Sequence, residues 1–206
     1  MPVYLILGIT YGLAAAVMPG PLSTYLISQA LTNGWRRTLP ATFAPLLSDG
    51  PIIVLVLLIL TRLPIWLEHL LRFSGGFFVL YLTVEAAKAW RAYDATTALR
   101  VRSSRQSLVK ATMVNLLNPN PYLSWTLVLG PLLLEGWREA PGNAVTLLAS
   151  FYAAMILVMV VIVALFSAAG NLGPKVNRSL IGVSAIALAC FGLYQLWMGV
   201  TSFWQT

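Results

Sequence analysis

Asp49 stands near the middle of a long apolar stretch, where an ionisable residue is expensive. An aspartate at the centre of a bilayer costs about 2.5 to 3.5 kcal/mol on insertion scales, so it usually has a partner or a function. The carboxylate is predicted to bind a substrate ammonium or to exchange a proton. The alternative is local: within Ser48-Asp49-Gly50-Pro51, a serine or aspartate oxygen would cap free amides where a helix restarts.

Two proline motifs interrupt two other apolar segments, Pro19-Gly20-Pro21 in the first and Asn118-Pro119-Asn120-Pro121 in the second. A proline inside a helix removes a backbone donor and clashes with the preceding turn, so each motif predicts a broken helix. In a bilayer, the freed backbone groups are tolerated only beside other protein or a water-filled cavity. The two motifs therefore predict a cavity near mid-membrane, where many secondary transporters bind their substrate.

The groups at these breaks suit an amino-acid-like ligand. A half-helix that begins after each motif presents free amides and the positive end of its dipole to a carboxylate, while Asp49 offers the opposite charge. The competing interpretation is that the polar side chains only satisfy the broken backbone or neighbouring helices. The predicted substrate-binding residues are Pro19, Gly20, Pro21, Ser23, Asn118, Pro119, Asn120 and Tyr122, with Asp49 as the site of proton or cation coupling.

The composition predicts an all-α polytopic membrane protein. Of the 206 residues, 59% are hydrophobic and 9% are charged, and the mean hydropathy is +0.81. A soluble domain carries about a quarter charged residues. The net charge of +7 is attributed to basic loops rather than to nucleic-acid binding. One cysteine, one histidine and no nucleotide or nucleophile motif predict no cofactor, no bound metal and no enzyme activity.

Six apolar segments reach the roughly 20 residues needed to cross about 30 Å of hydrocarbon. They run over residues 3–31, 39–60, 73–90, 108–134, 144–168 and 180–203. Most basic residues fall in loops on one face of this arrangement, and Arg62, Arg72 and Arg138 fall on the other. This bias predicts a cell inner-membrane protein with cytoplasmic basic loops and both termini outside.

The chain is predicted to contain two three-helix repeats, 1–91 and 108–206, joined by a basic cytoplasmic loop over 92–107. Pro19 lies 100 residues before Pro119, and Gly34-Trp35-Arg36 lies 102 residues before Gly136-Trp137-Arg138. Three spans per half reverse the direction of entry, so the repeats would be inverted, with the first and fourth helices broken.

These motifs resemble the LysE-type amino-acid exporter family of small membrane transporters over nearly the whole chain. The resemblance rests on Pro19-Gly20-Pro21, the Asn33-Gly34 turn, Asp49 and Asn118-Pro119. It departs at Asn120-Pro121-Tyr122, beside the expected substrate. The resemblance implies export of amino acids or related small zwitterionic or amine metabolites by alternating access, driven by the proton gradient. The implied partners are the substrate, protons and the lipid bilayer, and no nucleic acid.

Four other residues are given structural rather than functional roles. Glu85 is predicted to pair with Lys88 one turn later rather than to relay protons. His69 is predicted to lie in an outer loop. Gly8 and Gly12 permit close helix approach, and packing within the bundle is favoured over a homodimer interface.

Three rival functions stay open from the sequence. Cation or metal efflux would require intramembrane carboxylate, histidine or thiolate ligands, and one aspartate argues against it. An intramembrane redox protein is disfavoured because Cys190 alone cannot cycle a disulfide. A structural membrane protein would need no cavity between the proline breaks.

Overall fold

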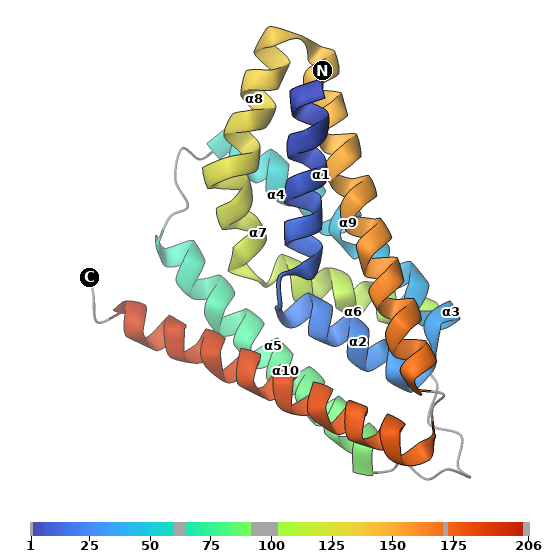
Figure 1. Ribbon diagram of the computed structural model, residues 1–206. Coiled ribbons are helices and arrows are strands. Elements are labelled where there is room, and N and C mark those ends of the chain that lie inside the picture. Colours follow the sequence, from blue (N-terminus) through green and yellow to red (C-terminus); the bar gives the residue numbers. More distant parts are fainter. Residues whose placement is uncertain (1, 60–64, 92–102, 171–172, 204–206) are drawn as a thin grey trace.

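The computed structural model describes residues 2–59, 65–91, 103–170 and 173–203, and within these ranges every element is helical (Figure 1). The predicted all-α class is confirmed. The elements are α1 (Pro2–Val17), α2 (Pro21–Asn33), α3 (Trp35–Thr38), the 3-10 helix η1 (Leu39–Phe43), α4 (Ala44–Ile59), α5 (Ile65–Arg91), α6 (Ser104–Leu116), α7 (Pro119–Ser124), the π-helix η2 (Trp125–Leu129), α8 (Gly130–Glu139), α9 (Pro141–Gly170) and α10 (Pro174–Phe203).

Several of these helices are long and apolar enough to cross a membrane. Among the described residues, four helical stretches qualify, Trp35–Leu57, His69–Arg91, Pro141–Gly170 and Lys175–Thr201, and the bent α1–α2 pair would be a fifth. Their outward faces carry exposed leucine, isoleucine and valine side chains, as contact with lipid requires. The fourth predicted span corresponds to α6 to α8, which does not qualify by length and composition. The count of six spans therefore stays a prediction.

The first predicted helix break is confirmed, and the chain bends there by 63°. The Met18 amide still donates to the Ala14 carbonyl at 2.9 Å, as in a regular helix. Gly20 adopts an extended backbone, so the helix cannot continue through it. Pro21 then occupies the first position of α2, where its missing N–H costs nothing. The Ser23 hydroxyl oxygen accepts from the Gly20 amide at 3.0 Å, so one freed donor of the break is satisfied.

The second predicted break, between α6 and α7, is also confirmed. Asn118 has an extended backbone, and its side-chain oxygen accepts from the Asn120 amide at 3.1 Å, as a helix N-cap does. Pro119 follows at the first position of α7. The Tyr122 hydroxyl donates to the Leu116 carbonyl at 3.0 Å, which satisfies an acceptor at the end of α6.

α1 packs closely along α9 through small residues, in agreement with the predicted use of Gly8 and Gly12 within the bundle. A Cβ on Gly8 would collide with the Ser150 hydroxyl, and one on Gly12 would collide with the Phe151 carbonyl. These close approaches let the two backbones meet with no side chain between them.

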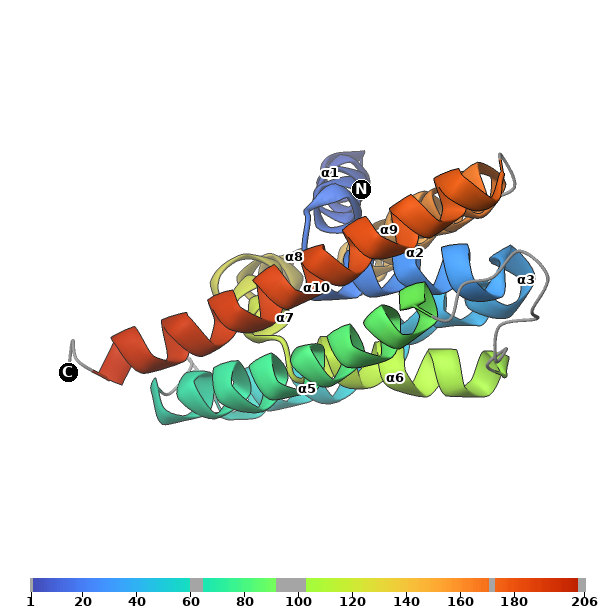
Figure 2. The same ribbon diagram turned by 90° about the horizontal axis from the view of Figure 1, so that it is seen from below.

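α5 and α10 form a second pair of long helices, which lie side by side in both views (Figures 1 and 2). A Cβ on Gly76 would lie 3.1 Å from the Gly192 carbonyl, and one on Gly192 would lie 3.2 Å from the Gly76 carbonyl. The neighbouring Gly75 abuts the Leu117 carbonyl at the second break. This pair therefore supports the broken segment from one side.

The basic elements gather at one end of the molecule. α3, the end of α5 and the starts of α6 and α10 lie together at the right of both views, whereas the end of α8 lies at the top of Figure 1 (Figures 1 and 2). The described basic residues on the gathered elements are Arg36, Arg37, Lys88, Arg91, Arg105, Lys110, Lys175 and Arg178. Arg62, Arg100 and Arg102 lie outside the described residues, as does most of the predicted 92–107 loop.

Two predictions are wrong. His69 does not lie in a loop, because α5 begins at Ile65 and buries the imidazole to 7% exposure. Glu85 binds Lys110 of α6 rather than Lys88, with the ammonium 2.6 Å from Oε2 and 2.7 Å from Oε1. The local spacing suggested a partner one turn away, but α6 packs beside α5 and brings a closer cation.

Candidate functional site

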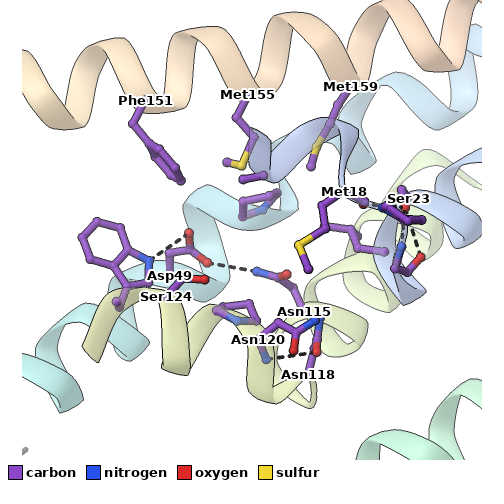
Figure 3. Close-up of a pocket in the computed structure, with 17 residues that line it drawn as sticks. Met18, Ser23, Asp49, Asn115, Asn118, Asn120, Ser124, Phe151, Met155 and Met159 are labelled. Carbon is purple, nitrogen blue, oxygen red and sulfur yellow. Dashed lines mark hydrogen bonds between the residues drawn. The ribbon is translucent and has the colours of Figure 1, made fainter. Parts of the chain in front are cut away.

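A cavity of about 120 Å³ lies between the two helix breaks, α4 and α9 (Figure 3). Six of the nine predicted site residues line it, and the other three, Pro21, Pro119 and Tyr122, are buried in the first turns of α2 and α7. The structure thus brings the two proline breaks and the predicted carboxylate to one cavity. The predicted residues in its lining are Pro19, Gly20, Ser23, Asp49, Asn118 and Asn120.

Asp49 is only 4% exposed, and both carboxylate oxygens accept hydrogen bonds from neutral donors. Oδ1 accepts from Asn115 Nδ2 at 2.9 Å and from the Ser48 hydroxyl at 3.4 Å. Oδ2 accepts from the Tyr152 hydroxyl at 3.1 Å and from Trp125 Nε1 at 3.4 Å. The donors come from α4, α6, η2 and α9, so four segments converge on one carboxylate.

α4 places this carboxylate inside a helix and not at its start. The helix begins at Ala44 and continues through Pro51, so the alternative that Asp49 caps a restarting helix is wrong. The single hydroxyl hydrogen of Ser48 is shared between Asp49 Oδ1 and the Ala44 carbonyl, which lies closer, at 3.0 Å within the same helix. Ile52 and Val56 continue the buried face of α4 beyond Asp49, and their packing holds the Asp49 side chain in the interior of the protein.

Asn115 links α4 to α6, and the sequence reasoning missed it. Its Nδ2 donates to the Ser48 hydroxyl at 2.7 Å as well as to Asp49. Both acceptors are buried, so the amide satisfies two polar groups that have little contact with water. The available signal was an amide in an apolar segment one turn before Asn118, on the same side of the helix as the break.

Trp125 reaches the carboxylate from a π-helical turn. Pro131 lacks the N–H that would continue the α-helical pattern, and the Gly130 amide instead donates to the carbonyl of Trp125, five residues earlier. Single π-helical turns are rare and frequently occur at functional sites. The indole is 2% exposed and packs edge-on against Phe151, with ring centroids 6.0 Å apart.

The opposite wall of the cavity is apolar. Phe151, Met155 and Met159 follow each other at four-residue spacing on α9 and point into the cavity, with Met18 from the first break near them (Figure 3). Each of the three α9 side chains is 4% exposed. Tyr152 lies beside this row and turns its hydroxyl to Asp49, so one helix supplies both an apolar wall and a donor.

The polar residues at the breaks are engaged in local hydrogen bonds. Ser23 bonds the Gly20 backbone, Asn118 caps α7 and Tyr122 bonds the end of α6. These contacts are those expected if the side chains satisfy the broken backbone. Within the described part of the chain, no three His, Cys, Asp or Glu side chains are grouped to hold a metal ion.

Comparison with known proteins gives a family and no individual relative. The chain matches the family model of the LysE type translocators over residues 13–199. The matched stretch contains both breaks, Asp49 and the donors that surround it, and it confirms the resemblance seen in the motifs. No curated protein and no solved structure matches.

Proposed function

Since the chain belongs to the LysE type translocator family and is a multi-pass membrane transporter, we propose that it exports amino acids or related small zwitterionic or amine metabolites. The observation that carries this proposal is the buried carboxylate of Asp49 in a cavity between two broken helices. Secondary transporters place their substrates at such breaks, where polar backbone is available within the membrane.

The substrate ammonium binds on the cavity side of Asp49 in this proposal. The carboxylate already accepts hydrogen bonds from neutral groups, which hold it in place without cancelling its charge. A cation is therefore its electrostatic complement. The first-turn amides of α2, at Leu22 and Ser23, precede the first intrahelical bond, from the Thr24 amide to the Gly20 carbonyl. They are proposed to face the substrate carboxylate.

Proton antiport follows from the same charge. A proton and a substrate ammonium each neutralise Asp49, and binding one removes the attraction for the other. If the carboxylate is open in turn to each side of the membrane, outward movement of substrate is coupled to inward movement of a proton. The groups that face Asp49 by hydrogen bonds are neutral ones, from Ser48, Asn115, Trp125 and Tyr152.

The proposed location is the cell inner membrane, with the basic end of the molecule in the cytoplasm. The gathering of α3, the end of α5 and the starts of α6 and α10 at one end supports this orientation (Figure 1). The two three-helix repeats, 1–91 and 108–206, are proposed to exchange inward-open and outward-open states around the cavity.

The test is transport by inside-out vesicles that contain the full chain, with an imposed pH gradient and a panel of labelled amino acids. Saturable accumulation of at least one amino acid that collapses with the gradient is the expected result. Vesicles without the protein are the control. If no panel member moves in a saturable, gradient-dependent way, the export proposal is wrong.

A further inference from the structure

Resting on the proposed export function, we infer that this transporter selects small amino acids, or their amine analogues, whose side chains are apolar and uncharged. The cavity combines one carboxylate with one apolar wall, and these two features define what it can hold. Leucine and methionine represent the favoured class, and lysine and glutamate represent the rejected one.

The charges around the cavity are the first support. Among the described residues that line it, Asp49 is the sole ionisable one, and none is a lysine, arginine or histidine. The α-ammonium of an amino acid would use this carboxylate. A second ammonium on the side chain would have no acidic partner there, and a side-chain carboxylate would face the charge of Asp49. Burying a charge without a partner is unfavourable.

The wall that faces Asp49 is the second support. Phe151, Met155 and Met159 project from α9, and Met18 projects from the first helix break (Figure 3). Methionine side chains are flexible and polarisable, so they adapt to apolar ligands of differing shape. None of these four side chains can replace the hydrogen bonds to water that a polar ligand loses when it binds.

The size of the cavity is the third support. Its volume of about 120 Å³ is several times the roughly 10 to 15 Å³ that a cavity needs, by the same measure, to hold one water molecule. The space is therefore larger than a single water site and can hold a small organic group. The remaining polar groups in the lining are neutral amides, hydroxyls and an indole, which cannot neutralise a guanidinium or a second ammonium.

The first experiment uses the full chain, purified and reconstituted in proteoliposomes, with labelled L-leucine, L-methionine, L-lysine and L-glutamate at equal concentrations. Leucine and methionine are expected to move more than about tenfold faster than lysine and glutamate, which corresponds to about 1.4 kcal/mol of discrimination. Lysine or glutamate transport at the leucine rate would overturn the selectivity and leave the export function standing. No movement of any of the four would overturn the selectivity, and the wider amino-acid panel described above would then decide whether the export proposal falls with it.

The second experiment changes the charge of the apolar wall. Met159→Glu adds a carboxylate to α9, and Met159→Gln adds a neutral side chain of the same shape as its control. The ratio of lysine to leucine transport is expected to rise at least about tenfold in the Glu variant and to stay low in the Gln variant. An equal ratio in the two variants contradicts the inference. If Met159→Glu does not elute as a folded species, the wild-type panel decides alone.

Discussion

The contact between α1 and α9 makes a quantitative prediction about Gly12. A Cβ at this position would collide with the Phe151 carbonyl and would lie 3.1 Å from the Ala154 Cβ. The obstacle is backbone, which cannot turn aside as a flexible side chain can, so α1 would have to move away from α9. Overpacking of this kind costs about 1 to 3 kcal/mol. We therefore expect Gly12→Ala to destabilise the folded protein by about that amount.

Gly50 is the matched control for this substitution. It lies in α4, and apart from its two chain neighbours and its own helical backbone no heavy atom lies within 4 Å of the point where a Cβ would stand, so an added methyl group meets no other element. Alanine is a better helix former than glycine, and Gly50→Ala is expected to stabilise α4 by about 0.5 to 1 kcal/mol. Thermal unfolding of both variants in detergent, followed by size-exclusion elution of the heated samples, compares them directly. A Gly12→Ala protein as stable as wild type would refute the close α1–α9 packing.

Three further predictions concern single polar contacts. Tyr152→Phe removes the 3.1 Å donor to Asp49 and keeps the ring, so the transport rate should fall about tenfold, the equivalent of one hydrogen bond to a charged group, with elution unchanged; an unaltered rate contradicts this assignment. Lys110→Gln should lower stability by about 1 kcal/mol, and the exchange of Glu85 with Lys110 should restore part of it; a double variant no better than the single one would count against the pair. Asn118→Ala removes the cap of α7 and should cost about 1 kcal/mol; if substrate affinity falls while expression holds, the asparagine contacts substrate and is more than a cap.

The helix breaks and the buried acid were predictable because their causes are local. Prolines at the two motifs remove backbone donors wherever the chain goes, and an aspartate in an apolar segment is costly in any fold of that segment. The same locality explains why Gly8 and Gly12 could be assigned to helix packing. These features follow from a few neighbouring residues and need no knowledge of tertiary contacts.

The donors to Asp49 could not be predicted in the same way. Asn115, Trp125 and Tyr152 are separated from it by 66, 76 and 103 positions, and only the packing of α4, α6, η2 and α9 brings them together. In an almost wholly apolar segment, hydropathy also gives no sign of which face of the helix meets lipid and which meets the cavity. For that reason the sequence could not show that Met155 and Met159 of α9 face the cavity.

The predictions of element boundaries and ion pairs failed for related reasons. The polar run around His69 suggested a loop, yet α5 extends through it and buries the imidazole. Glu85 has a cation one turn away in sequence, but Lys110 approaches to 2.6 Å from another helix. Short-range rules identify the partners available to a residue, and tertiary packing decides among them.

The central claim is that Asp49 couples substrate export to proton entry, and Asp49→Asn tests it most directly. Asparagine keeps the shape of the side chain but can neither carry the charge nor exchange a proton. In proteoliposomes, wild-type efflux of the best-transported amino acid should accelerate when protons can flow inward, with substrate and proton fluxes rising together. The Asp49→Asn protein should fold and show no such acceleration. Export by this variant with an unchanged dependence on the pH gradient would contradict the account.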